Sequence, residues 1–279
     1  MIHLRPMKVE DIAPVVEVIG RHDEDDGESA QAVFADADLA DYLVLEHRGR
    51  VAGVTGCVGI PVSDGAFWLS WTYLDKALQG KGLGRELIAR AIGQARERGG
   101  RKLFLKISDY QDPQDGDVYG AARRCYVAAG FREELTIRDY YDHDENLIVM
   151  GLALRPPPAL RAPGEIVPER PAIELDRWFE IADTDNAYTC SWRVRRAASA
   201  LGAAVARKGD AAFSAANLEK GLAAMRERGA RLVVMSFPSN LPLVLAPLQA
   251  AGFERLGQLN DYYGQGLHEM HFAHYLDRP

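Results

Sequence analysis

The chain has 279 residues, of which 47% are hydrophobic and 26% charged, and its formal net charge is -7. This profile is typical of a globular protein with room for two domains, and the acidic balance argues against a general nucleic-acid binder. No run of 18 apolar residues occurs and the first ten residues are mixed and charged, so we expect neither a membrane span nor a signal peptide. Cys57, Cys125 and Cys190 lack disulfide or zinc-ligand spacing, which predicts reduced thiols, no metal and a cytoplasmic protein.

Strand-like and helix-like segments alternate along the first half. Apolar Ile12, Val15, Val16 and Ile19 recur at helical spacing, whereas short apolar runs bounded by turn residues predict strands. The expected strands are residues 2–5, 42–46, 51–58, 67–74, 102–107, 135–141 and 146–154, and the expected helices are residues 8–20, 84–98 and 120–129. This order predicts a mixed α/β layer.

A proline-rich segment, residues 155–171, holds six of the 14 prolines. Proline continues neither a helix nor the interior of a sheet, and proline-rich stretches favour extended conformations. We therefore expect a linker between two domains, residues 1–154 and residues 172–279.

Three short motifs of the first half recur in the second half in the same order. Arg96-Glu97-Arg98-Gly99 recurs 130 residues later, and both Ala128-Ala129-Gly130-Phe131 and Asp139-Tyr140-Tyr141 recur 122 residues later. The recurrence predicts that the second half is a diverged copy of the first. The change in spacing means about eight extra residues in the first half, and the acidic loop at residues 108–117 is the candidate.

A glycine-rich turn, Gln79-Gly80-Lys81-Gly82-Leu83-Gly84-Arg85, follows an expected strand and opens an expected helix. Glycines bring several backbone N–H groups to one point, and the helix N-terminus adds free N–H groups and the positive end of its dipole. The turn therefore suits a pyrophosphate. It has neither the P-loop pattern nor the dinucleotide fingerprint, because its glycines fall at alternate positions.

The pattern Q-x-x-G-x-G after a strand ending in Tyr73-Leu74-Asp75 resembles the pyrophosphate motif of the GNAT superfamily, the acetyl-CoA-dependent N-acetyltransferases. Ala122-x-x-x-Tyr126-x-x-x-Gly130-Phe131 is similar to the second signature of that superfamily, and residues 138–150 resemble members that acetylate protein N-termini. The resemblance covers residues 1–154. It implies a GNAT-like, mostly antiparallel mixed sheet flanked by helices, in tandem here with a second, degenerate GNAT-like domain.

The resemblance also implies acetyl-CoA as co-substrate and assigns roles to individual residues. Tyr126 would protonate the departing thiolate, and the backbone around Tyr73 and Leu74 would hold the pantetheine arm and polarise the acetyl carbonyl. Tyr119 stands where the family often has an asparagine that contacts pantetheine. The predicted cofactor-binding residues are Tyr73, Leu74, Gln79, Gly80, Lys81, Gly82, Leu83, Gly84, Arg85 and Tyr119.

The catalytic base is not assigned by the resemblance, because Lys106 stands where N-terminal acetyltransferases tend to have glutamate. An alkyl amine, with a pKa near that of lysine (about 10.4), must lose a proton before it can attack a carbonyl. A carboxylate in or near the acidic loop is the expected acceptor of that proton. Asp109 is the predicted catalytic residue, and the other candidates are Asp75, Asp112, Asp115 and Asp117.

Two acidic segments, residues 22–28 and residues 108–117, predict a small cationic amine as the acetyl acceptor, since carboxylates attract a protonated amine. The predicted substrate contacts are Glu24, Trp71 and Tyr140. Protein or peptide N-acetylation and a non-catalytic acyl-CoA-binding regulator are the alternative functions.

The second half is predicted to lack this chemistry. Under the two shifts, the glycine turn maps onto residues 209–214, Tyr126 maps onto Leu248, and the strand at residues 67–74 maps onto residues 197–204, which read as helix. We expect an inactive, partial domain that packs on the first as a partner subunit would, or a module that binds another protein, in a monomer or a homodimer.

Overall fold

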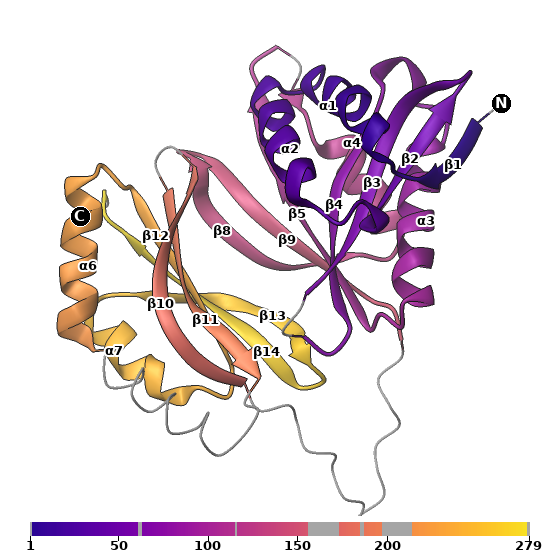
Figure 1. The fold of residues 1–279 in the computed structure, drawn as a ribbon. Helices are drawn as coiled ribbons and strands as arrows, with labels where there is room; N and C mark the ends of the chain where they lie inside the picture. The colour runs from indigo at the N-terminus through magenta and orange to yellow at the C-terminus, as the bar shows by residue number, and fades with distance from the viewer. Residues whose placement is uncertain are drawn as a thin grey trace, which may run out of the picture.

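The computed structural model describes residues 2–60, 63–114, 116–155, 173–184, 187–196 and 214–277 (Figure 1). The first half is built on a seven-stranded sheet in the order β1-β2-β3-β4-β5-β9-β8, in which only β4 and β5 run parallel. Its strands are β1 (Ile2–Pro6), β2 (Tyr42–His47), β3 (Arg50–Gly59), β4 (Ala66–Leu74), β5 (Lys102–Ser108), β8 (Arg132–Asp142) and β9 (Glu145–Ala153). The expected mixed, mostly antiparallel sheet is confirmed.

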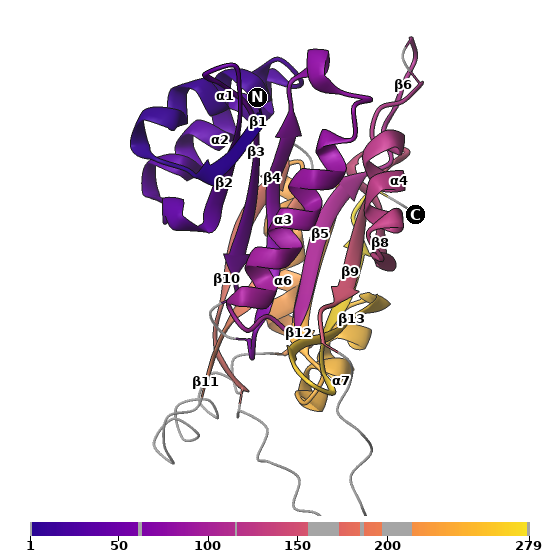
Figure 2. The same ribbon diagram turned by 90° about the vertical axis from the view of Figure 1, so that its right-hand side faces the viewer.

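Helices pack on both faces of this sheet. Val44 packs against α1 and α2, whereas its neighbour Leu45 packs against α3, because successive strand residues point to opposite faces. Figure 2 shows α3 and α4 on one face, where they cover the apolar side chains of β5 and β9. The helices are α1 (Ile12–Gly20), α2 (Glu24–Asp36), α3 (Leu83–Glu97) and α4 (Gly120–Ala128), with short 3-10 turns η1 (Val9–Asp11), η2 (Leu39–Asp41) and η3 (Lys76–Leu78).

Helix α2 is absent from the elements that the sequence pattern predicts in chain order. Its first turn is acidic and is followed by Gly27, which disfavours a helix interior. The carboxylate of Asp23 caps the helix by accepting a hydrogen bond from the Asp26 N–H at 3.1 Å. A Cβ on Gly27 would lie 2.9 Å from Cα of Gly20, so the close crossing of α1 and α2 requires this glycine.

The acidic loop at residues 108–117 forms a small hairpin of β6 (Gln111–Asp112) and β7 (Gly116–Asp117). The corresponding connection in the second half runs from β12 to α7 through the short turn η4 (Pro242–Val244). The extra residues that the repeat predicts therefore fall in this hairpin.

The second half is built on a five-stranded sheet in the order β10-β11-β12-β14-β13. This order and its strand directions repeat those of β3-β4-β5-β9-β8, with one parallel pair, β11 and β12. The elements are β10 (Ile173–Thr184), β11 (Ala187–Arg196), α6 (Ala215–Glu227), β12 (Leu232–Pro238), α7 (Leu245–Ala250), β13 (Glu254–Gly264) and β14 (Leu267–Tyr275). No helix in the described ranges is long and apolar enough to cross a membrane.

The repeated Asp-Tyr-Tyr motif has the same geometry in both halves. Asp139 and Asp261 both have left-handed backbones, with φ of 51° and 57°. The tyrosine rings that follow each aspartate contact each other edge to face, with centroids 5.0 Å and 4.9 Å apart. Two motifs 122 residues apart thus share an uncommon conformation, which supports a common origin of the two sheets.

One predicted correspondence is wrong. The partner of β4 in the second sheet is β11 at Ala187–Arg196, not residues 197–204. The offset between these two strands is near 121 residues, while the offset between α3 and α6 is 130, so the second half has a longer connection between strand and helix. Residues 197–204, most of residues 209–214 and nearly all of the proline-rich segment lie outside the described residues.

A shared apolar core joins the two sheets. Tyr262 of β13 packs on Trp68 of β4 and on Phe104 of β5, with ring centroids 6.1 Å and 5.3 Å away. Tyr140 and Leu135 of β8 lie in the same core, together with Leu259 of β13. The second sheet therefore covers the part of the first sheet that α1 and α2 leave open, on the same face (Figure 1).

Candidate active site

The glycine-rich turn lies between β4 and α3. Gly80 and Gly82 have positive φ angles of 74° and 84°, which glycine adopts without steric cost. Helix α3 begins at Leu83, and its first internal bonds run from the N–H groups of Arg85 and Glu86 to Gly82 O. The N–H groups of the preceding residues therefore have no acceptor within the helix.

The turn also leaves room for a ligand. A Cβ placed on Gly80, Gly82 or Gly84 would meet no described atom within 4 Å. Lys81 and Arg85 are exposed beside it, and the Lys81 ammonium bonds to Ala77 O at 2.8 Å. Open space, free N–H groups and two cations together fit the pyrophosphate of an acyl-CoA.

The only parallel pair of the first sheet, β4 and β5, separates along its length. The two strands pair at Ala66, Phe67 and Trp68 and at no later residue, although both continue. Beyond that point β4 carries a bulge at Trp71, whose φ is 47°, so that two residues of β4 oppose one residue of β3. The gap between the strands leaves backbone groups of β4 free to bind an extended ligand such as a pantetheine arm.

Tyr126 reaches the bulge from α4. Its side chain is buried, and its hydroxyl bonds to the side chain of Thr72 on β4. Burial raises the pKa of Tyr126 to about 12, and the bond to Thr72 opposes this rise. The phenol consequently keeps its proton at neutral pH and is available as a donor.

Asp26 reaches the bulge from the other face. The Tyr73 hydroxyl donates a hydrogen bond to the Asp26 carboxylate. Burial raises the pKa of this carboxyl, the bond from Tyr73 opposes the rise, and the charges of Asp23 and Asp25 add to it. Thr72 and Tyr73 are consecutive on β4, so a phenol and a carboxylate meet one point of the strand from its two faces.

Two further tyrosines and an acid lie around Asp26. Burial, together with the negative charges of Asp26, Asp23 and Glu145, raises the pKa of Tyr119 to about 12. Burial also raises the pKa of Tyr141, as do the groups of Tyr119, Glu145 and Asp26. Negative charges beside aromatic rings suit a protonated amine.

The predicted base, Asp109, is held in a structural contact. Its two carboxylate oxygens accept bonds from the backbone N–H of Asn146 at 2.7 Å and from the Asn146 side-chain amide at 2.6 Å. A base needs a free lone pair for the incoming proton, so Asp26 is better placed for that role than Asp109.

The other candidate carboxylates also have local partners. Asp75 caps η3 through the Ala77 N–H and pairs with Arg21 at 3.2 Å. Asp112 accepts the Gln114 N–H at 2.7 Å within the hairpin. Asp117 lies against Gly120 at the start of α4, and Asp115 lies outside the described residues.

The three predicted substrate residues lie in different surroundings. Glu24 is exposed on the first turn of α2, whereas Asp26 of the same turn faces inward. Trp71 packs between Phe34 and Tyr73, beside Asp26. Tyr140 is only 3% exposed and lies in the core between the sheets, which does not favour the predicted contact with substrate. Asp139 has a left-handed backbone, and Tyr141, which packs against the same core, is influenced by the groups of Tyr119, Glu145 and Asp26.

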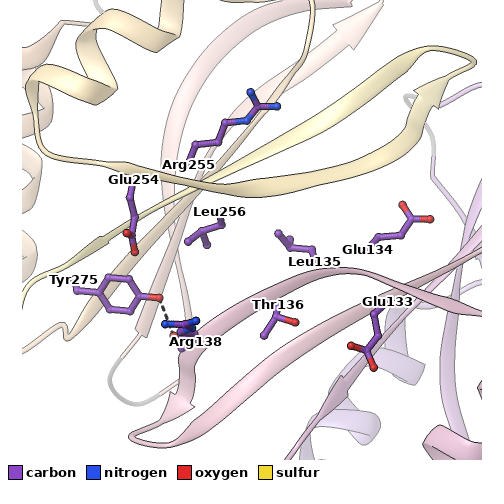
Figure 3. A pocket seen from close by; sticks show the side chains of 9 residues that line it. All are labelled: Glu133, Glu134, Leu135, Thr136, Arg138, Glu254, Arg255, Leu256 and Tyr275. Carbon is purple, nitrogen blue, oxygen red and sulfur yellow. Dashed lines mark hydrogen bonds between the residues drawn. The ribbon is translucent and has the colours of Figure 1, made fainter.

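A groove of about 740 Å³ lies at the junction of the two halves, between β8 and β13 (Figure 3). Its acids are partly neutralised, because Glu133 pairs with Arg123 and Glu134 pairs with Lys102. It contains none of the predicted catalytic or cofactor-binding residues. Its lining residues are Glu133, Glu134, Leu135, Thr136, Arg138, Glu254, Arg255, Leu256 and Tyr275.

Residues 10–131, which include the bulged β4, the glycine-rich turn and α3, match the model of the acetyltransferase (GNAT) family, so this region of the chain is a GNAT acetyltransferase domain. A search of curated proteins found no match. Among the described residues, no group of three or more His, Cys, Asp or Glu side chains is arranged to hold a metal ion.

Several solved structures are similar to this domain. A putative GNAT acetyltransferase from Desulfovibrio desulfuricans is 24% identical, with 56% of this chain and 100% of that chain covered and a TM-score of 0.49. The ribosomal-protein-S18-alanine N-acetyltransferase of Escherichia coli is 22% identical, with coverage of 58% and 100% and a TM-score of 0.45. The aminoglycoside 6'-N-acetyltransferase of Enterococcus faecium is 13% identical, with coverage of 56% and 99% and a TM-score of 0.46.

Proposed function

We propose that the first half transfers the acetyl group of acetyl-CoA to a small cationic amine. The observation that carries this proposal is the approach of Asp26 and Tyr126 to consecutive residues of β4, where β4 and β5 have separated. One group can remove a proton from the acceptor and the other can return a proton to the leaving group.

Different backbone groups bind the pyrophosphate and the pantetheine arm in this proposal. The N–H groups at Gly82, Leu83 and Gly84 hold the pyrophosphate, and the free backbone of β4 beyond Trp68 orients the pantetheine arm. When bound, acetyl-CoA supplies an activated acetyl thioester. Backbone N–H groups at the bulge of β4 are proposed to stabilise the negative charge that the carbonyl oxygen gains, an oxyanion-type contribution.

The proton balance uses two side chains. The ammonium form of the acceptor first loses one proton to solvent through Asp26, and Asp26 then accepts the second N–H proton as the C–N bond forms. The C–S bond breaks, and Tyr126 donates its phenolic proton to the sulfur before it is reprotonated from solvent. A carboxyl with a raised pKa is a stronger base than an ordinary one, which favours the first transfer.

The acceptor is proposed to be cationic because of the charges around Asp26. The charges of Asp23 and Glu145 act on Tyr119, and Tyr73, whose hydroxyl bonds to Asp26, contacts the ring of Trp71. Aromatic faces and carboxylates together bind an ammonium group and place it next to a base.

The test is thiol release from acetyl-CoA with a panel of acceptors: a diamine, an amino sugar, a neutral amine, an anionic amino acid and peptides with free N-termini. We expect the diamine or the amino sugar to give the highest kcat/KM. Highest activity with peptides would support protein N-acetylation instead. Binding of acetyl-CoA without transfer to any acceptor would support a non-catalytic regulator.

A further inference from the structure

Two arginines connect the halves of the molecule by reciprocal contacts. Arg231, just before β12, donates from Nη1 to the carbonyl oxygen of Asp139 at 2.7 Å. Arg101, just before β5, donates from Nη2 to the carbonyl oxygen of Asp261 at 2.6 Å. The arginines are 130 residues apart and the aspartates 122 residues apart, as the repeat requires. Each half therefore donates from its arginine to the equivalent carbonyl oxygen of the other half, as two subunits do across an isologous dimer interface.

The backbone of each arginine is fixed in the same way. Leu276 N–H bonds to Arg231 O at 2.8 Å, and Leu154 N–H bonds to Arg101 O at 2.9 Å. Arg231 is only 7% exposed, so its guanidinium is held at the junction and not in solvent. The contact is thus part of the packed interface.

The Asp139 carbonyl belongs to the end of the hairpin formed by β8 and β9, residues 139–146, which we call the Asp139 corner. A left-handed backbone is unfavourable for aspartate and persists where surrounding bonds hold it. Asn146 accepts the Asp139 N–H at 2.9 Å, and the Asp139 side chain accepts the Asp144 N–H at 2.9 Å. From the second half, Arg231 donates to the Asp139 carbonyl, and Tyr275 donates to the neighbouring carbonyl of Arg138 at 3.1 Å.

The corner connects directly to the proposed acceptor site. It places Tyr140 in the core between the sheets and Tyr141 near Tyr119 and Asp26. On the facing strand, Glu145 adjoins Asn146 and accepts a bond from the Ser108 hydroxyl at 2.5 Å. A shift of the corner would move Tyr141 and Glu145 together.

We propose that Arg231 is a positioning residue for acetyl transfer: from the second half, it holds the Asp139 corner and thereby sets the acceptor-binding wall of Tyr141 and Glu145. The inference rests on the proposed function of the first half. It gives the second half a definite role, which is to complete the acceptor site without contributing a group that touches substrate.

The test compares Arg231→Met with the matched variant Arg101→Met in the full chain. Methionine keeps much of the side-chain volume and removes the donor. We expect Arg231→Met to raise the acceptor KM by about 5- to 10-fold, the size of one hydrogen bond. The KM for acetyl-CoA should stay unchanged, and Arg231→Lys should restore part of the acceptor KM.

The control should behave differently, because Arg101 holds the corner of the inactive half. Arg101→Met should leave the acceptor KM within about twofold of the unmodified protein, a change smaller than one hydrogen bond. Equal effects of the two variants on the acceptor KM would overturn the inference, since they would indicate a general loosening of the interface.

Hydrogen exchange separates this inference from the proposed function. Arg231→Met should speed exchange of the Asp139 and Asp144 amides, and Arg101→Met should not. If the unmodified protein transfers acetyl to no amine, the proposed function fails, while the exchange data still show whether Arg231 holds the corner. Unchanged exchange in Arg231→Met would overturn the positioning role by itself.

Discussion

The two sheets of this protein share a strand order and differ at the point where chemistry would occur. In the first sheet the parallel pair β4 and β5 is joined at three positions and then separates. In the second sheet the parallel pair β11 and β12 stays joined through five positions, from Ala187 with Leu232 to Ser191 with Ser236. The same topology therefore has fewer paired positions between β4 and β5 than between β11 and β12, and the proposed acetyl-transfer site lies where β4 and β5 are unpaired.

Side chains at equivalent positions of the two halves also differ. Tyr126 of α4 corresponds to Leu248 of α7, and both residues accept the bond that ends their helix, from Phe131 N–H and Phe253 N–H. Glu145 at the start of β9 corresponds to Leu267, which is buried in the shared core. Tyr126 and Leu248 both pack in apolar cores, and at both pairs of positions the polar group is present only in the first half. Asp139 and Asp261 both have left-handed backbones and both lie at the interface, so the two halves share this geometry where they meet.

The largest effect is expected when carboxylates replace two glycines of the glycine-rich turn and prevent it from binding a pyrophosphate. Acetyl-CoA at about 100 times its Kd should stabilise the unmodified protein by about 2.7 kcal/mol, because it binds the folded state only. The double variant Gly82→Asp, Gly84→Asp should lose this stabilisation, since two carboxylates would block and repel the pyrophosphate. Thermal denaturation with and without acetyl-CoA measures it.

Gly93→Asp is the matched control for the glycine-rich turn. It places the same charge in α3, at another glycine with open space around its Cβ position. This variant should keep the full stabilisation by acetyl-CoA. Full stabilisation of the double variant would place the cofactor site elsewhere, for example on the second sheet.

Replacement of Asp26 should give the next largest effect. Asp26→Asn can still accept the Tyr73 bond but takes no proton, so kcat/KM should fall by roughly 10³-fold, within the range for a general base. Glu24→Gln, an exposed residue of the same helical turn, should have little effect. Steady-state thiol release measures both variants.

The pH profile provides an independent check on Asp26. Only its ionised form is a base, so activity should be lost as the pH falls through its pKa. Burial raises that pKa, so the loss should begin at a higher pH than for an ordinary carboxyl. An unchanged acidic limb in Asp26→Asn would return the role of base to another carboxylate.

Tyr126→Phe should lower kcat by roughly 10²-fold, because the departing thiolate loses its proton donor. The phenyl ring should keep the edge-to-face contact with Phe131, whose ring centroid lies 5.8 Å away, so the binding of acetyl-CoA should persist. Single-turnover kinetics and thermal shifts separate these two effects. An unchanged rate would remove Tyr126 from the mechanism.

The sequence predicts those parts of the fold that depend on local pattern. The strands of the first sheet, the glycine-rich turn and α4 with Tyr126 follow from apolar spacing, glycine and helix-end signals. The repeated Asp-Tyr-Tyr motif also predicts two equivalent hairpins. These features need no long-range information.

The remainder depends on tertiary contacts that a linear pattern does not contain. Asp26 was one of several acids in residues 22–28, and only the crossing of α1 and α2 at Gly20 and Gly27 directs it toward Tyr73. The burial of Tyr140 in the core between the sheets likewise depends on tertiary packing. The offset of β11 was wrong because no shared motif marks that strand.

The smallest expected effect comes from replacing single acidic side chains that attract a cationic acceptor. The acidic hairpin at residues 108–117 is one source, but Asp109 and Asp112 accept bonds within or beside the hairpin. Glu145 is a second source and acts directly on Tyr119 and Tyr141.

We expect Glu145→Gln to raise the KM for a diamine roughly 3-fold, the range for a partly exposed charge, and Asp112→Asn to leave it unchanged. The difference should shrink as salt is added, since the screening length is about 8 Å at physiological ionic strength. If Asp112→Asn raises the KM as much as Glu145→Gln does, long-range attraction by the hairpin accounts for the preference. If neither does, Asp26 and the aromatic rings are sufficient, and the loss of an acid at Leu267 in the second half has no bearing on acceptor choice.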